Sequence, residues 1–256
     1  MAWCTSDDGK YRIESITHTT FPGALQVMRE GFIPNAATCI ALEVDKDPLA
    51  VEELLELCAD AALDGLSLVA VTTETEEVAA TVFSKLQEKP TPGLTEKSFV
   101  EIFNEERCKR PSTKAMMDFI VERDSKCNYF DRYDVDCFCE IMFLGTKPEH
   151  RQKGLAKLLL KTAVEVAKKV REGAITPLTI ADLGPKYAFM KPRKPIMTPP
   201  QLCTALWSSA VTKKCGDSLG FTTLEVFSYD DLIYNGKPCS ARLGPDLTCE
   251  GAALKI

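Results

Sequence analysis

The sequence lacks the features that mark a membrane or secreted protein. It has no apolar run near the roughly 18 residues that a membrane-spanning helix needs, so we expect no membrane partner. The segment Met1–Lys10 contains neither the basic start nor the apolar core of a signal peptide, and we therefore expect a cytoplasmic protein. With 256 residues and 45% hydrophobic content, the chain can bury a substantial core, as one large domain or two small ones.

Metal ligands and excess positive charge are also scarce. The eleven cysteines are scattered without a Cys-x-x-Cys pair, and His18 and His150 are the only histidines, so no metal site is expected. Cys137 and Cys139 lie two residues apart on an expected strand and share one face, which is typical of buried thiols in a reducing compartment. The net charge of −6 argues against nucleic-acid binding and is compatible with a cationic substrate.

The most informative stretch of the chain joins an apolar strand, a short basic loop and a helix. The strand ends at Pro148 and the helix is expected to begin near Gly154, so its free N–H groups point back toward the strand end. These amides and the positive end of the helix dipole can bind a pyrophosphate if the backbone can approach it closely. Gly154 and Ala156 permit that approach, and Arg151 and Lys153 add charged donors.

On its glycine alone, this segment could be an ordinary strand–turn–helix unit. The full pattern Arg-x-x-Gly-x-Ala at residues 151–156 is more specific. It resembles the acyl-CoA-binding motif of the GCN5-related N-acetyltransferase (GNAT) superfamily, Gln/Arg-x-x-Gly-x-Gly/Ala. A Walker loop is excluded because Gly-Lys-Ser/Thr is missing, and a dinucleotide fingerprint because Gly-x-Gly-x-x-Gly is missing.

The expected order of elements resembles the GNAT fold over nearly the whole chain. That fold is an α/β (α+β) architecture with a mixed central sheet of about seven strands, flanked by helices and splayed between the fourth and fifth strands. The chain would then form a single N-acetyltransferase domain, residues 1–256. Expected strands are 10–17 (an edge strand), 66–73, 78–86, 134–146, 178–183, 222–229 and 248–256; expected helices are 21–32, 47–62, 99–108, 111–126, 154–171 and 201–218; expected turns or loops are 89–93, 184–200 and 235–236.

More narrowly, the chain resembles the insect arylalkylamine N-acetyltransferases, the group that includes dopamine N-acetyltransferase. The residues that carry this likeness are Phe32–Asn35, Glu52–Cys58, Asp64–Ala70, the motif after Pro148, and Ala205–Phe221. The resemblance implies an enzyme that transfers an acetyl group from acetyl-CoA to a small primary amine, an arylalkylamine first of all; we expect the chain to act as a monomer. A polyamine, a protein lysine or a longer acyl-CoA stays open, as does a degenerate acyl-CoA-binding protein without turnover.

The resemblance also places the cosubstrate. In the superfamily, acyl-CoA lies between two splayed strands, with its thioester held by backbone amides of the central strand and its pyrophosphate held by the loop. That implies Leu144, Gly145 and Thr146 beside the pantetheine and acetyl end. The phosphates would be held by Arg151, Gln152, Lys153, Gly154, Leu155, Ala156 and Lys157.

Amide formation needs a proton acceptor, because an aliphatic amine has a pKa of about 10 and is mostly protonated at neutral pH. Glu140 is the expected base. It stands eleven positions before Arg151, the spacing that the catalytic glutamate of the histone-acetylating branch keeps from its own motif. Apolar neighbours on its strand would raise its pKa toward a useful value. The alternative is a strand glutamate that reaches solvent or a basic neighbour.

The catalytic residues of the insect enzymes match less well. Their assigned base lies in a Phe-x-Pro-x-Glu-Pro-type segment, but here Ala36 occupies that position in one alignment and Asp47 in another. Both alignments stay open, and either puts dopamine preference in doubt. The serines of their penultimate helix correspond to Ser208 and Thr212, which could protonate the leaving CoA thiolate or could bond their own backbone.

Overall fold

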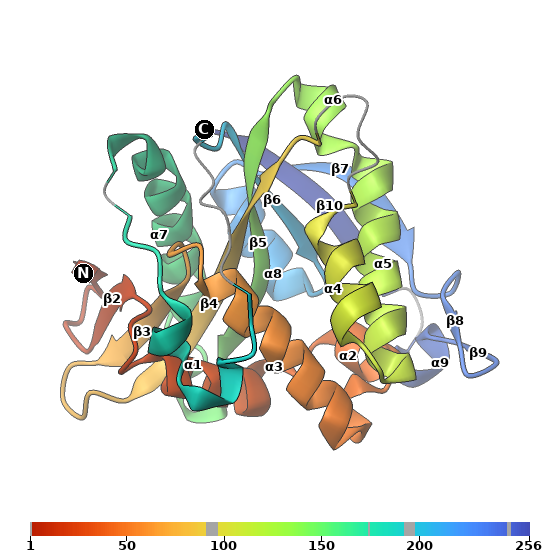
Figure 1. The fold of residues 1–256 in the computed structure, drawn as a ribbon, viewed down its shortest axis with the longest axis horizontal. Helices are drawn as coiled ribbons and strands as arrows, with labels where there is room; N and C mark the ends of the chain where they lie inside the picture. Colours follow the sequence, from red (N-terminus) through yellow and green to blue (C-terminus); the bar gives the residue numbers. More distant parts are fainter. Residues whose placement is uncertain (1, 91–96, 174, 192–197, 245–246) are drawn as a thin grey trace.

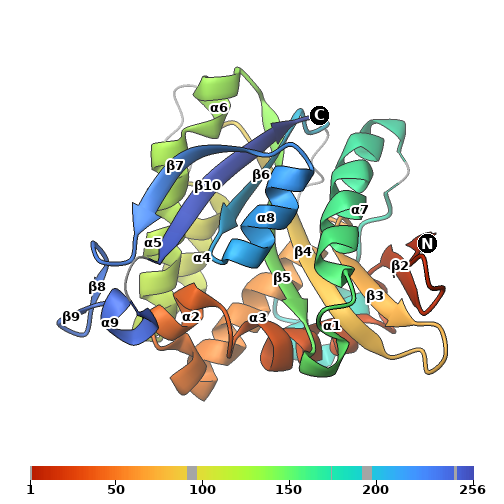
Figure 2. The same ribbon diagram turned by 180° about the vertical axis from the view of Figure 1, so that it is seen from behind.

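The computed structural model describes residues 2–90, 97–173, 175–191, 198–244 and 247–256. Within these ranges, eight strands form one sheet in the order β1-β2-β3-β4-β5-β6-β10-β7 (Figure 1, Figure 2). Neighbouring strands run antiparallel, except for the parallel pair β5 and β6. The bounds are β1 Ala2–Thr5, β2 Tyr11–Ser15, β3 Leu68–Thr72, β4 Val78–Glu88, β5 Cys137–Thr146, β6 Leu202–Trp207, β7 Thr222–Ser228 and β10 Thr248–Lys255, with a separate hairpin of β8 Ile233–Tyr234 and β9 Lys237–Pro238.

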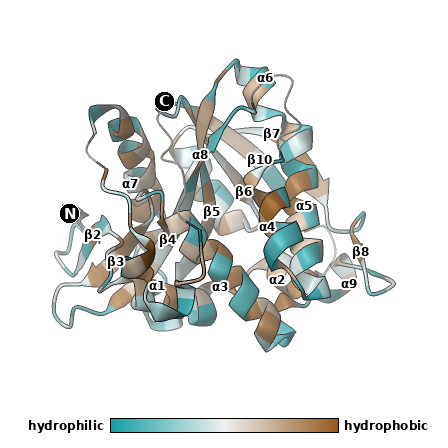
Figure 3. Ribbon diagram, viewed as in Figure 1, coloured by the Kyte–Doolittle hydropathy of each residue, from teal (hydrophilic) through white to brown (hydrophobic). Residues whose placement is uncertain are grey.

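Helices cover both faces of this sheet. One buried core joins it to α1, α3, α4 and α5, and a second core joins its other face to α7 (Figure 1, Figure 2). The ribbons of α5 and α7 alternate between hydrophobic and hydrophilic residues, as expected for helices with one buried face (Figure 3). The bounds are α1 Phe21–Val27, continued by a π-helix Met28–Phe32, α2 Ala37–Ala41, α3 Pro48–Ala62, α4 Phe99–Arg107, α5 Pro111–Cys127, α6 Tyr129–Tyr133, α7 Leu155–Lys169, α8 Ala210–Ser218 and α9 Ser240–Leu243.

Most of the expected elements are confirmed, together with the local signals that predicted them. Asp47 caps α3 by accepting hydrogen bonds from the backbone of Leu49 at 3.0 Å and of Ala50 at 3.4 Å. Asn235 and Gly236 both have positive φ and form the turn between β8 and β9. In the part of the chain that the structure describes, no helix is long and apolar enough to cross a membrane.

Three predicted elements are wrong. Residues 178–183 form no strand; Ile180–Leu183 is a 3-10 turn, capped by reciprocal hydrogen bonds between Thr179 and Asp182. The predicted helix 201–218 begins instead as β6, whose residues are nearly all buried, so its apolar run carries no alternation that would distinguish a strand. The strand at 10–17 is not at the edge, because β1 pairs with it. Parts of the predicted turn 89–93 and loop 184–200 lie outside the described residues.

The pairing of the central strand positions everything that follows. Strands β5 and β6 pair only from Phe138 opposite Leu202 to Ile141 opposite Ala205, and then diverge. The predicted splay therefore exists, although its second side is β6 and not 178–183. On the other side of β5, the register with β4 shifts and leaves Met142 without a partner.

Candidate active site

Two cavities meet where β5 and β6 diverge. The inner cavity, of about 70 Å³, is lined by Met116, Phe119 and Ile120 from α5, by Glu140 and Met142 from β5, and by Trp207 from β6. The outer cavity, of about 500 Å³, lies over the loop after β5 and the start of α7. Both cavities share Phe32, Leu144, Ser208 and Thr212 in their walls. A long ligand could therefore enter past the loop and reach the interior.

The loop before α7 has the backbone shape of an anion site. Gly154 is the N-cap of α7 and has φ of +76°, and Gln152 has φ of +61°. No atom lies within 4 Å of the position where a Cβ on Gly154 would stand, so the backbone there faces open space. The N-terminus of a fifteen-residue helix thus opens into the outer cavity without a side chain in front of it.

The structure brings most of the predicted loop residues to this cavity. Its walls include Leu144, Thr146, Arg151, Gln152, Gly154, Leu155, Ala156 and Lys157. Gly145 is not among the residues that line this cavity. A Cβ on Gly145 would lie only 3.2 Å from Phe32 and from Val27, so the residue is closely packed on that side. Lys153 points elsewhere: its ammonium donates to the carbonyl of Glu149 at 3.0 Å and lies over the ring of Tyr11.

Arg151 links this loop to the π-helix. Its guanidinium donates to the carbonyl of Thr146 at 3.4 Å and to that of Gly31 at 3.3 Å. The π-helix can approach β5 this closely because residue 31 is glycine: a Cβ there would lie 2.4 Å from the Thr146 carbonyl oxygen. The next residue, Phe32, reaches both cavities and contacts the ring of Phe143.

Glu140 is a buried carboxyl at the inner end of the opening. It is 6% exposed and accepts a hydrogen bond from the Gln87 amide at 2.8 Å. Burial raises the pKa of Glu140, and the bond from Gln87 and the charge of Lys85 oppose that rise. Lys85 stands opposite Glu140 on β4, but its ammonium donates to Asp64 at 2.8 Å. Glu140 therefore neither reaches solvent nor forms the main ion pair of this lysine.

The alternative base, Asp47, is occupied by other contacts. Besides capping α3, its carboxylate accepts a hydrogen bond from Arg110 at 2.6 Å, and this bond is the main reason why the pKa of Asp47 is lowered. Asp47 is absent from the walls of both cavities, as far as the described residues define them, whereas Ala36 lines the outer one.

Ser208 and Thr212 differ in whether their hydroxyls are already hydrogen-bonded. Ser208 lies between β6 and α8 and has no hydrogen-bond partner among the described residues. Thr212 is tied to the helix start, because its hydroxyl donates to the Ser209 carbonyl at 3.0 Å. Ser209 caps α8 through the Thr212 backbone N–H. The phenol of Tyr187 could in principle also act as an acid, but Tyr187 is 2% exposed against Phe21 and is not among the residues lining either cavity.

Several residues around Glu140 carry no sequence signal of their own. Gln87 and the apolar face of α5 reach the opening only because of how α5 and β4 pack in the fold. Trp207 could have been found only by recognising β6 as a buried strand.

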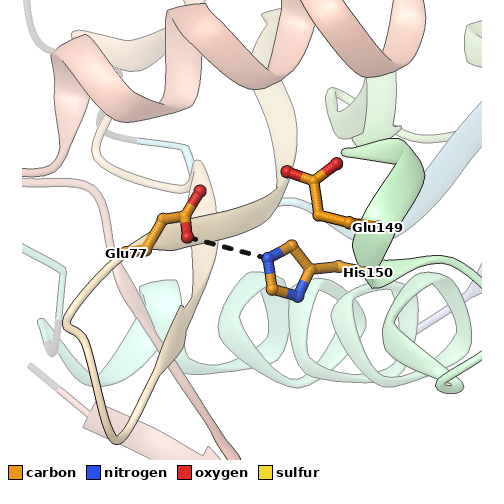
Figure 4. A group of neighbouring side chains, drawn as sticks. All are labelled: Glu77, Glu149 and His150. Carbon is orange, nitrogen blue, oxygen red and sulfur yellow. Dashed lines mark ion pairs between the residues drawn. The ribbon is translucent and has the colours of Figure 1, made fainter.

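A charged group anchors the start of the loop. Glu77, Glu149 and His150 offer ligand atoms within 4.8 Å of one another (Figure 4). Glu77 accepts a hydrogen bond from Lys147 at 2.5 Å, which lowers its pKa, and His150 Nδ1 lies 3.0 Å from the Tyr11 hydroxyl. Because Lys147 already neutralises Glu77, we interpret this group as a set of structural contacts that hold the loop against β2 and β4.

Comparisons with known proteins agree with this geometry. Residues 126–182 match the model of the acetyltransferase (GNAT) family, a range that contains β5, the loop and α7. No curated protein sequence matches the chain. The predicted superfamily resemblance is thus confirmed for the segment that carries the motif.

Solved structures share the fold. Arylalkylamine N-acetyltransferase 2 from Aedes aegypti has 20% identity and a TM-score of 0.72, covering 96% of this chain and 99% of its own. A putative arylalkylamine N-acetyltransferase 7 from the same mosquito has 17% identity and a TM-score of 0.69, covering 96% and 87%. A Drosophila melanogaster polyamine N-acetyltransferase has 12% identity and a TM-score of 0.67, covering 96% and 100%. The GNAT fold is therefore confirmed, and the family match together with these neighbours supports an N-acetyltransferase.

The burial of Glu140 predicts a pH-dependent change in stability when its charge is removed. Below about pH 4.3 the carboxyl is protonated in both the folded and unfolded states, so it adds no penalty. As the pH rises, the unfolded state ionises first, and the folded state loses stability until the pH exceeds the raised folded pKa. Glu140→Gln removes the charge and keeps an acceptor for Gln87. Its melting temperature should exceed that of the wild type more at pH 8 than at pH 5.

The matched control is Glu74→Gln, at an exposed position in the turn between β3 and β4. Its melting temperature should follow the wild type at both pH values. An equal effect of Glu140→Gln at pH 5 and pH 8 would contradict the desolvation of this carboxyl.

Proposed function

We propose that the chain is an N-acetyltransferase that transfers the acetyl group of acetyl-CoA to a small primary amine between β5 and β6. The observation that carries this proposal is the position of Glu140. A buried carboxyl with a raised pKa lines the inner, mostly apolar cavity, and this cavity shares walls with the outer cavity over the loop before α7. The eleven free cysteines, most of them buried, fit a reducing compartment such as the cytoplasm, where we propose that the protein acts as a monomer without a metal.

Acetyl-CoA would bind along the outer cavity. Its pyrophosphate would accept hydrogen bonds from the backbone at Gly154–Ala156, and Lys157 and Arg151 would contribute positive charge. Arg151 would exchange its two carbonyl partners for the phosphate. The pantetheine arm would pass Leu144 and Thr146, which line the same cavity.

The reaction would then require three groups: a base for the amine, a hydrogen-bond donor for the thioester oxygen and an acid for the leaving thiolate. Glu140 would take a proton from the ammonium group, and the neutral nitrogen would attack the thioester carbon. Met142, which has no partner in β4 or β6, would offer its backbone N–H to the carbonyl oxygen as that oxygen gains charge. The C–S bond would break, Ser208 would give its hydroxyl proton to the CoA thiolate, and the proton that the nitrogen loses as the amide forms would restore the Ser208 hydroxyl.

The inner cavity favours an aromatic amine. Its walls carry the rings of Phe32, Phe119 and Trp207, and Glu140 is the acidic residue that lines it. A flat ring can pack against such a surface, with its amine directed to the carboxylate. A polyamine is the second candidate, because one solved structure of this fold is named for polyamine acetylation. A second cationic group, however, would find mainly apolar side chains in this cavity.

One prediction concerns the cosubstrate. Gly154→Val should weaken acetyl-CoA binding by at least about tenfold, because a branched side chain would fill the space in front of the helix N-terminus and strain a residue with φ of +76°. Isothermal titration calorimetry measures the affinity. Gly173→Val is the control, since Gly173 also has positive φ and open surroundings but lies at the opposite end of α7. Equal affinities in the two variants would contradict the proposed phosphate site.

Another prediction tests the activity itself. Tryptamine, dopamine, octopamine, spermidine and a lysine peptide are supplied with acetyl-CoA, and release of the CoA thiol is followed. At least one aromatic amine should react, and Glu140→Gln should lower its turnover by about 10²-fold with little change in acetyl-CoA affinity.

If acetyl-CoA binds and every amine is inert, the chain is an acyl-CoA-binding protein without turnover. Reaction of spermidine alone, or of the peptide alone, would overturn the arylalkylamine assignment and keep the acetyltransferase. Turnover of Glu140→Gln within about twofold of the wild type would remove Glu140 from the mechanism.

A further inference from the structure

A third cavity lies beside the end of β4, apart from the two cavities of the proposed site. Its volume is about 550 Å³, and its walls come from Asp60 of α3, residues 85–88 of β4, helix α4 and residues 189–191. Gln87 is part of these walls, and its amide donates to the Glu140 carboxylate at 2.8 Å. One hydrogen bond therefore joins a wall of the third cavity to the carboxyl that lines the inner cavity.

The third cavity and the outer cavity lie on opposite sides of Glu140 along β5. Gln87 stands opposite Phe138, which precedes Glu140 by two residues, whereas Leu144, a wall of the outer cavity, follows Glu140 by four. At about 3.3 Å per residue, Phe138 and Leu144 are about 20 Å apart along the strand. A ligand in the outer cavity therefore leaves the third cavity free.

Acetyl-CoA in the outer cavity would cover the approach to the inner cavity. Most of the half-exposed residues that line the inner cavity also line the outer one, namely Phe32, Leu144, Ser208 and Thr212. Gln87, in contrast, is half-exposed and stands between Glu140 and the third cavity. An amine that binds after acetyl-CoA needs another route to Glu140, and the Gln87 side chain lies on one.

The third cavity has aromatic walls whose ring faces already contact cations. These walls include the rings of Phe99, Phe103 and Phe189. The Lys85 ammonium lies 4.5 Å from the centroid of Phe99, and the Arg107 guanidinium lies 4.3 Å from that of Phe189. Phe189 is 56% exposed and so belongs to the open part of the wall. Such rings suit a ligand that carries both a flat ring and a positive charge.

The charges of the third cavity that are left without a close partner are negative. Lys85 and Arg107 already donate to carboxylates, at 2.8 and 2.6 Å respectively. Glu88 is exposed and forms no ion pair within the described ranges. Glu106 is also exposed, and its ion-pair partner there is Lys191 at 4.0 Å. The open side of the cavity therefore attracts a cation more than an anion.

We propose that the third cavity is the entrance for the amine, which an arylalkylammonium ion occupies while acetyl-CoA fills the outer cavity. Gln87 then gives up its hydrogen bond to Glu140 and turns toward the exposed end of β4. The ammonium group takes its place as the donor to Glu140, and the ring of the amine follows into the inner cavity. No covalent bond changes in this step. The inference rests on the proposed acetyl transfer and adds the route by which the second substrate arrives.

A bulky side chain in the entrance tests this route. Ile102 lines the third cavity and is 45% exposed, so Ile102→Trp narrows the cavity at its open side. Stopped-flow mixing follows tryptamine, dopamine and octopamine as they bind to protein saturated with CoA. The association and dissociation rate constants should both fall by about tenfold, with little change in Kd, because a narrowed route slows passage in both directions. A changed binding site would alter Kd instead.

The matched control is Leu49→Trp, at an aliphatic residue that is 59% exposed and outside the three cavities, as far as the described residues define them. It should keep the rate constants of the wild type. The entrance is overturned if the two variants bind the amines at the same rates, or if Ile102→Trp raises Kd together with a lower melting temperature. Gln87→Ala, which removes the side chain between the cavities, should speed association at least about twofold.

Charge reversal at the rim tests the attraction of the ammonium group. Glu88→Lys combined with Glu106→Lys should slow association by about tenfold at low ionic strength, and high salt should reduce this difference. Glu74→Lys combined with Glu165→Lys changes the net charge equally at exposed positions outside the cavities and should have a much smaller effect. Equal association rates in the two double variants contradict the acidic entrance.

These binding rates need no chemistry, so they separate the entrance from the acetyl transfer. If the amines are acetylated but Ile102→Trp binds them like Leu49→Trp, the entrance fails and the transfer stands. If Ile102→Trp slows binding as expected and the wild type acetylates no amine, the transfer fails and the third cavity remains the route of an arylalkylamine ligand. If no amine binds to the protein with CoA, the entrance is overturned.

Discussion

The divergence of β5 from β6 after Ile141 and Ala205 is the constraint on which the rest of the site depends. A parallel pair inside a sheet normally satisfies its backbone groups along its whole length, and an opening leaves groups that must find other partners. The inner and outer cavities lie along this divergence. The missing partner of Met142 on β4 extends the same break to the other side of β5. The ligand proposed for this opening would supply the contacts that the neighbouring strand does not.

Burial at the opening serves two opposed purposes. The apolar side chains of α5 and β6 that line the inner cavity can hold a flat ligand, and the same surroundings raise the pKa of Glu140. A buried carboxyl that can ionise reduces fold stability above its pKa and gains basicity in return. The Gln87 amide limits that effect by holding the carboxylate in one position. Asp64 holds the Lys85 ammonium in place by a hydrogen bond, and the charge of Lys85 opposes the rise in the pKa of Glu140.

The parts of the site that depend on local backbone chemistry could be predicted from the sequence. Gly154 marks a positive φ at a helix start, and Asp47 followed by Pro48 marks an N-cap, so both elements were found from a few adjacent residues. The parts that depend on long-range packing could not. The residues of β6 are almost all buried and nearly all apolar, so they show neither strand nor helix periodicity, and the segment was predicted as a helix. Gln87 likewise gives no signal in the sequence until the pairing of β4 with β5 brings its amide to Glu140.

The central claim is that acetyl-CoA and an aromatic amine meet at Glu140 in the opening between β5 and β6. A bisubstrate analogue, tryptamine joined through its acetyl group to the sulfur of CoA, tests this claim most directly. A crystal structure of its complex should place the amide nitrogen within about 3 Å of the Glu140 carboxyl, the indole in the inner cavity and the pyrophosphate at Gly154. An analogue bound with its amide away from Glu140, or with its pyrophosphate away from the N-terminus of α7, would contradict the account.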